Sequence, residues 1–213
     1  MKYIYNKNAF NEIVTEEDAY WLGFLLADGY ISGGEKPFVQ LKLGAKDKEH
    51  LVKFIKYMQY NSLNVIKETF GGAYAKDNLC YVVKISCKQL NENLKKYGLG
   101  GPKSAIEIPY KLNNIELEKH YIRGIIDGDG WIRSTQYGFG ICGSYETLSY
   151  IKEYINKNIV NVEDNNITKH GKIFKFELTS KIKTELILKY FYKDAKIYLN
   201  RKFDLYFCNY CRG

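Results

Sequence analysis

The sequence predicts an α+β protein of two pseudo-symmetric lobes, each with the element order α-β-β-α-β-β-α. Two observations lead to this prediction: a nine-residue motif recurs at about half the chain length, and pairs of strand-like segments alternate with helix-like ones. Strand pairs in this order favour antiparallel sheets over a parallel βαβ sheet. We expect an N-terminal lobe over residues 1–110 and a C-terminal lobe over 111–213, joined by a linker around 108–114 in one compact monomer.

The repeated motif consists of Trp21–Gly29 (WLGFLLADG) and Ile122–Gly130 (IRGIIDGDG), and its acids Asp28 and Asp129 are 101 positions apart. Acidic residues precede each copy, as is typical of the first turn of a helix. Each copy ends in Asp-Gly, and we expect the glycine to supply the left-handed residue that closes a helix. Each motif is therefore predicted to be a helix that ends at its acid.

Similar elements follow the two motifs. In both halves, the motif is followed by segments in which apolar and polar residues alternate as in strands. A predicted helix, a second strand pair and a closing helix come next. The segments that show this pattern are 38–43, 47–59 and 83–88 in the first half, and 131–133, 138–141, 145–156 and 176–181 in the second.

Small residues recur four positions apart within both motifs. Gly23 and Ala27 share one helix face, as do Gly124 and Gly128, because positions i and i+4 lie above one another. A glycine inside a helix costs about 1 kcal/mol relative to alanine, so a matched pair favours a packing role over a chance occurrence. We expect the two smooth strips to face each other in a close contact between the helices.

The acids that end the motifs point to a metal site. Asp28 and Asp129 lie at helix C-termini, where the macrodipole disfavours negative charge, and two converging carboxylates also repel each other. Both penalties disappear if a hard divalent cation such as Mg²⁺ lies between them, with backbone carbonyls of Ala27 and Gly128 as further ligands. The alternative is that both acids belong to ordinary solvated turns.

Composition limits the remaining possibilities. The net charge is +8 and the basic excess is spread over both halves, which favours a polyanionic partner. The chain has no apolar leader and no apolar stretch that could span a bilayer. Five cysteines without a framework spacing fit a reducing compartment, either a bacterial or phage-host cytoplasm or an organelle matrix. Cys208 and Cys211 form a lone CxxC, for which packing is favoured over zinc binding.

The two nonapeptides resemble the paired signature of the LAGLIDADG homing endonucleases, and with the surrounding repeat the resemblance covers nearly the whole chain. It implies that the motif helices form the interface between lobes, and that each four-stranded sheet forms a saddle over the major groove. It also implies that Asp28 and Asp129 bind Mg²⁺, or Mn²⁺ or Ca²⁺ in its place, and drive phosphodiester cleavage. The first copy departs from the signature with Leu26 where an acid is common, whereas the second keeps Asp127.

Basic and polar residues at matched or alternating positions are candidates for the remaining roles. Lys88 and Lys181 follow the last strand of each half and resemble the family's active-site lysines. Residue types that pair with base edges occur along the predicted strands, although each could be ordinary solvated surface. These DNA-contact candidates are Gln40, Lys42, Lys84, Arg133, Gln136 and Lys175.

The resemblance thus predicts a single-chain endonuclease that makes a staggered double-strand break in a long, asymmetric DNA site. Two alternatives stay open on the sequence alone. One is an RNA-splicing maturase that binds its host intron RNA, since some members of this family assist splicing. The other is a DNA-binding regulator on the same scaffold that has lost cleavage, which the retention of both acids argues against.

Overall fold

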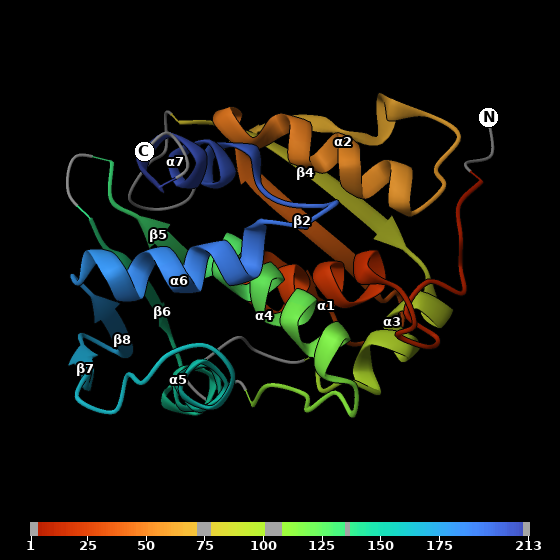
Figure 1. The fold of residues 1–213 in the computed structure, drawn as a ribbon. Coiled ribbons are helices and arrows are strands. Elements are labelled where there is room, and N and C mark those ends of the chain that lie inside the picture. The colour runs from red at the N-terminus through yellow and green to blue at the C-terminus, as the bar shows by residue number, and fades with distance from the viewer. Residues whose placement is uncertain (1–3, 72–77, 101–107, 135–136, 211–213) are drawn as a thin grey trace.

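A computed structural model describes residues 4–71, 78–100, 108–134 and 137–210. Over these residues it contains seven α-helices and two four-stranded antiparallel sheets, which confirms the predicted α+β class (Figure 1). The elements of the first half are α1 (Glu16–Asp28), β1 (Gly29–Ile31), β2 (Phe38–Gly44), α2 (Lys48–Tyr57), β3 (Lys67–Phe70), β4 (Leu79–Ser86) and α3 (Lys88–Lys95). Those of the second half are α4 (Ile115–Asp129), β5 (Gly130–Ile132), β6 (Phe139–Gly143), α5 (Tyr145–Asn158), β7 (Ile167–His170), β8 (Ile173–Leu178), α6 (Lys181–Tyr192) and α7 (Asn200–Tyr210).

The two sheets share one topology. Their strand orders are β1-β2-β4-β3 and β5-β6-β8-β7, so the strand that follows each motif helix lies at the edge of its sheet. Gly29 is opposite Leu41, which is opposite Val83 in the next strand. In the second sheet, Gly130, Ile141 and Phe176 form the matching row. These rows mark equivalent positions in the two lobes.

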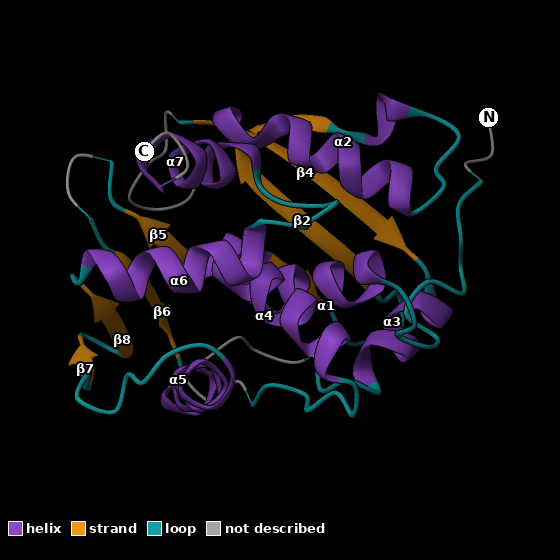
Figure 2. Cartoon of the chain, in the orientation of Figure 1, coloured by secondary structure: helices purple, strands orange, loops and turns teal. Residues whose placement is uncertain are grey.

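Helices cover one face of each sheet (Figure 2), and the alternating burial along β2 and β8 identifies the other face as open. Side chains alternate accordingly along β2, where Val39, Leu41 and Leu43 are buried and the intervening Gln40 and Lys42 are partly exposed. Because successive side chains of a strand point to opposite faces, the polar residues of β2 all lie on the open face.

Local interactions explain where both motif helices begin and end. The Thr15 side chain accepts a hydrogen bond from the Asp18 amide, and the Asn114 side chain caps α4 in the same way. The expectation of left-handed closing glycines is wrong, because Gly29 and Gly130 have φ of −75° and −90°. Glycine is needed at both positions because a side chain would not fit. A Cβ on Gly29 would lie 2.6 Å from the Leu25 carbonyl oxygen, and a Cβ on Gly130 would lie 2.6 Å from that of Ile126.

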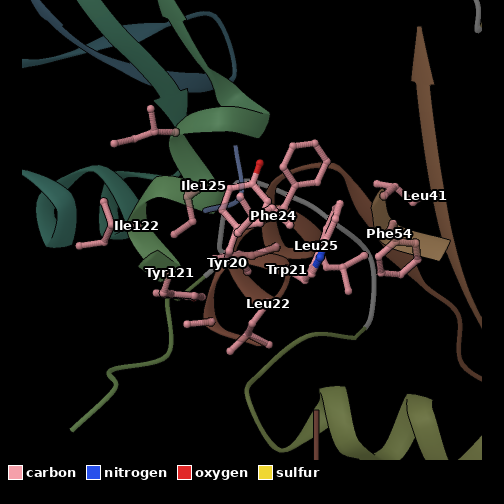
Figure 3. Packing of buried hydrophobic residues seen from close by; sticks show 14 of the residues in the cluster. Tyr20, Trp21, Leu22, Phe24, Leu25, Leu41, Phe54, Tyr121, Ile122 and Ile125 are labelled. Atoms are coloured by element: carbon pink, nitrogen blue, oxygen red, sulfur yellow. The ribbon is translucent and has the colours of Figure 1, made fainter. Parts of the chain in front are cut away.

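Helices α1 and α4 form the most extensive contact between any two described elements, at the centre of the molecule (Figure 1). A Cβ built on Gly23 would collide with the Tyr121 carbonyl oxygen. A Cβ on Gly124 would collide with the Tyr20 carbonyl oxygen and lie 2.7 Å from the Phe24 amide nitrogen. The two backbones therefore touch directly at these glycines. Aromatic and aliphatic side chains on both sides of the crossing fill the surrounding core (Figure 3).

The final helix, α7, is an element that the sequence reading did not anticipate. It reaches back to the first lobe, where Arg201 forms an ion pair with Asp47 with an N–O distance of 2.9 Å. At its other end the Asn209 side chain donates to the Arg133 carbonyl beside β5. Helix α7 thus bridges the two lobes, and the boundary between residues 110 and 111 remains a prediction.

Two further expectations concern membranes and cysteines. No helix of the described residues is long and apolar enough to cross a bilayer. Cys80, Cys87, Cys142 and Cys208 are free thiols, and Cys208 is exposed at the surface of α7. Cys211, its partner in the CxxC, is outside the described residues.

The glycine contact predicts the response to a larger side chain. We expect Gly124→Leu to lower the free energy of unfolding by more than about 3 kcal/mol, because the side chain would have to separate two touching backbones. Gly33→Leu is the matched control, since a Cβ at Gly33 meets nothing within 4 Å and that residue lies in an exposed loop. Urea unfolding followed by circular dichroism measures both. Equal free energies of unfolding for the two variants would contradict the close contact between α1 and α4.

Candidate active site

The acids of the two motifs lie at neighbouring helix ends. Asp28 is exposed and ends α1, and Asp129 is half-buried and ends α4. A Cβ built on Gly128 would collide with the Cβ of Ala27 and lie 3.5 Å from Asp28 Oδ2. The Asp28 carboxylate therefore lies beside α4 at the residue that precedes Asp129. The close helix crossing brings the two helix ends together, and each acid directly precedes the first strand of its lobe.

A buried lysine from α7 lies at the same place. Lys202 is 1% exposed, and its Nζ donates to the carbonyl oxygens of Ile126 and Asp127 at distances of 2.8 and 2.6 Å. The Asp127 carbonyl is among those that the end of a helix leaves without an intrahelical partner, whereas the Ile126 carbonyl also accepts from the Gly130 amide. Burial lowers the pKa of Lys202 to about 8, while Asp127, Asp28 and Asp129 act in the opposite direction. The ammonium is thus a counter-charge beneath the acid pair.

Asp127 is the centre of a buried hydrogen-bond network. Its carboxylate accepts from the hydroxyls of Tyr20 and Tyr192 at 2.7 and 2.5 Å, and from the Leu199 amide at 2.7 Å. Burial, followed by the charge of Asp127, raises the pKa of both tyrosines well above the usual value, so both hydroxyls stay protonated and donate. The network ties α1, α4 and α6 to the segment that leads into α7, and so holds Lys202 in place.

The acid pair fits a hard divalent cation in its donor types. Such ions prefer carboxylate and carbonyl oxygens, and here each motif helix contributes one carboxylate and the carbonyls near its end. Cys142 lies near Asp129, but burial and the charge of Asp129 raise the pKa of its thiol, which keeps it neutral. Among the described residues no group of three or more His, Cys, Asp or Glu side chains could hold a metal. A cation here would therefore depend on backbone, water or substrate oxygens for its other ligands. Ala27 and Gly128, the predicted carbonyl ligands, are in contact at this point.

Lys88 and Lys181 occupy matched positions in the two halves. Lys88 is the first residue of α3 and Lys181 the first residue of α6, so each begins the helix that follows the last strand of its half. Lys88 pairs with Glu92 at 3.8 Å, and the Lys181 ammonium lies 4.4 Å from the centre of the Tyr137 ring. The described contacts of both lysines are with groups other than the acids, and their active-site role remains a prediction.

The DNA-contact candidates lie on the open sheet faces as far as the structure describes them. In the first lobe, the Lys42 Nζ donates to the Phe70 carbonyl and the Lys84 Nζ lies 3.6 Å from the centre of the Phe38 ring, while Gln40 is opposite Lys84. In the second lobe, Arg133 and Lys175 both pair with Glu177. Gln136 is outside the described residues. Contact with DNA remains a prediction for all six.

Sequence reasoning missed Lys202 and set Asp127 aside. The only sequence signal for Asp127 was that the second motif has an acid where the first has Leu26. Lys202 carries no signal of its own among 28 lysines, because only the path of the chain after α6 brings it under α4.

The buried Lys202 predicts a pH dependence of stability. Its pKa in the folded protein, about 8, is below the usual 10.5, so between these values the unfolded chain binds more protons. The free energy of unfolding should therefore rise with pH in this window, whereas the full cost of burying the ammonium is present below pH 8. We expect a rise of about 1.5 kcal/mol from pH 8 to 9.5 in the wild type relative to Lys202→Met. Lys88→Met, at an exposed position, should show the same rise in the free energy of unfolding as the wild type. Identical pH profiles for all three proteins would contradict this prediction.

Comparisons with known proteins agree on the fold. Neither family models nor curated proteins give a match to the sequence. Among solved structures, the I-SmaMI LAGLIDADG homing endonuclease bound to cleaved DNA is similar with a TM-score of 0.61 and 12% identity, over 93% of this chain and 88% of that one. The I-LtrWI LAGLIDADG homing endonuclease bound to target DNA has a TM-score of 0.59 and 13% identity, over 96% and 90%.

A third solved structure, the N-terminal LAGLIDADG domain of DUF199/WhiA, has a TM-score of 0.54 and 14% identity, over 93% of both chains. The chain spans 63% of the full-length DUF199/WhiA from Thermatoga maritima. At these identities the likeness concerns the fold alone. The protein therefore has the two-lobed α+β fold of the LAGLIDADG homing endonucleases and of the LAGLIDADG domain of DUF199/WhiA.

Proposed function

We propose that this protein is a divalent-metal-dependent endonuclease that binds double-stranded DNA as a monomer and cuts both strands of an asymmetric site. The observation that carries the proposal is the convergence of Asp28 and Asp129 at the contact of α1 and α4, with the Lys202 ammonium buried beneath them. Structural stability alone does not account for two acids at helix C-termini. A pair of hard oxygen donors between two open sheet faces suits phosphodiester hydrolysis.

Each residue of the site has a defined part in this proposal. Asp28 and Asp129 would hold Mg²⁺, which supplies Lewis-acid stabilisation and lowers the pKa of bound water. Lys202 would balance the charge of the acids and fix the end of α4. Asp127 would position Lys202 through the segment before α7. The acids therefore keep one geometry while a DNA phosphate approaches.

The open sheet faces support DNA as the partner. Their polar residues include Gln40, Lys42 and Lys84 in one lobe and Arg133 and Lys175 in the other, and such side chains pair with phosphates and base edges in the major groove. The net charge of +8 favours the same partner. Two solved relatives in fold are described as bound to DNA.

Replacement of either acid should separate binding from cutting. We expect Asp28→Asn and Asp129→Asn to keep DNA affinity within about tenfold and to lower double-strand cleavage by a factor of at least ~100. Asp164→Asn, at an exposed acid in a surface turn, is the matched control and should cut like the wild type. Gel-shift titration in Ca²⁺ and cleavage in Mg²⁺ measure the two properties. Specific binding without any cutting by the wild type would identify a DNA-binding regulator instead.

Lys202 should matter to cleavage more than the two lysines expected from the sequence. We expect Lys202→Met to lower the cleavage rate roughly 10²-fold, in the range seen when a positioned electrostatic group is removed. Lys88→Met and Lys181→Met should stay within about threefold of the wild type, because a loss of surface charge acts mainly through weak, salt-dependent binding. Single-turnover cleavage at saturating enzyme removes the contribution of binding. A greater loss in Lys88→Met than in Lys202→Met would reverse this assignment.

A further inference from the structure

The open face of the second sheet carries a charged cluster of Arg133, Lys175 and Glu177. Arg133 Nη2 lies 2.5 Å from Glu177 Oε1, and Lys175 Nζ lies 2.8 Å from Glu177 Oε2, so each carboxylate oxygen accepts from a different cation. Lys175 and then Arg133 hold the pKa of Glu177 below its usual value, which keeps the carboxylate ionised. The side chains of Arg133 and Lys175 are 37% and 34% exposed, whereas Glu177 is 19% exposed. The acid thus lies below two cations that face outward.

Two glycines of the second sheet make this arrangement possible. A Cβ on Gly138 would lie 2.7 Å from Arg133 Cδ, so the stem of Arg133 lies directly across the backbone of Gly138. A Cβ on Gly140 would collide with the Trp131 indole, so this ring lies directly across the backbone of Gly140. Gly140 is opposite Glu177 in β8. Gly138, just before β6, and Gly140, within β6, therefore leave room for the long side chains of Arg133 and Trp131 to extend toward Glu177.

The equivalent surface of the first lobe is built differently. From the matching strand rows, Gln40 stands where Gly140 does, and Lys84 stands where Glu177 does. Lys84 lies over the Phe38 ring, and no ion pair links the described open-face residues of β1, β2 and β4. The acid-centred cluster is therefore particular to the second lobe, and the two halves of a DNA site would meet different chemistry.

We propose that Glu177 positions Arg133 and Lys175 to read guanine in the half of the DNA site that the second lobe covers. Guanine presents two neighbouring acceptors, O6 and N7, in the major groove, and Arg or Lys is the usual partner of this pair. A carboxylate that already fixes the guanidinium reduces the conformational entropy lost on binding. This inference rests on the proposed function, because it concerns the specificity of the same DNA-binding surface.

The strand geometry also indicates where this guanine would lie. Arg133 directly follows β5 and is four positions after Asp129, which corresponds to about 13 Å of extended chain. With a rise of about 3.4 Å per base pair, this corresponds to about four base pairs from the phosphate that Asp129 serves. The contact therefore belongs to the inner part of the half-site.

Selection from a library of DNA duplexes with randomised sequence tests the proposal. The full chain is incubated with the library in Ca²⁺, which replaces Mg²⁺ so that bound DNA stays uncut, and the salt concentration is fixed because affinity depends on it. The proteins compared are the wild type, Arg133→Ala, Glu177→Gln and Lys84→Ala. Lys84→Ala removes the open-face residue at the matched position of the other lobe, and thermal melting checks that each variant is folded.

We expect the wild type to enrich a guanine in one half-site, and Arg133→Ala and Glu177→Gln to lose that preference by roughly tenfold. The base preferences of Arg133→Ala and Glu177→Gln in the half-site of the first lobe should be unchanged. Lys84→Ala should alter the preferences in the half-site of the first lobe alone. If Glu177 only neutralises the two cations, Glu177→Gln should bind all sequences more tightly and keep the guanine, which would overturn the inference. Enrichment of a base other than guanine at that position would also overturn it. A wild type that enriches no sequence would instead contradict the proposed function itself.

Discussion

The contact between α1 and α4 is the constraint on which the other features of the molecule depend. At Gly23 and Gly124 each backbone touches the other, and no residue with a side chain fits there. This approach joins the two lobes through their motif helices, and it also sets the separation of Asp28 and Asp129 one to two turns further along. The roughly 1 kcal/mol that a glycine costs inside each helix is offset by the packing that becomes possible around the crossing.

Charged groups hold this helix pair at two places. Near the start of α1, Glu16 accepts from the buried Arg123 guanidinium at 2.6 Å, and Arg123 also donates to the Ile197 carbonyl. At the opposite end, Lys202 and Asp127 hold the last turn of α4. Both arrangements use the segment between α6 and α7, so this segment contacts α4 both at Arg123 and at its last turn.

The two lobes share a topology but differ in the chemistry of their open faces. Strand order and register repeat from one sheet to the other, since both are set by the same pattern of buried residues and edge strands. The open faces are free of this packing constraint, and one carries Lys84 where the other carries Glu177. A single chain with two such faces suits a DNA site whose halves have different sequences.

The sequence by itself determined the fold class, the internal repeat, the two motif helices and the matched glycines and acids, because periodicity and spacing encode them directly. It misjudged the closing glycines, whose role is space and not a left-handed backbone. It pointed to Lys88 and Lys181 as the site lysines, a role that remains a prediction, and no pattern marked Lys202, which the tertiary structure buries against the end of α4. Burial and proximity between residues distant in the chain decide which of 28 similar lysines is buried at the end of α4, and no local pattern records them.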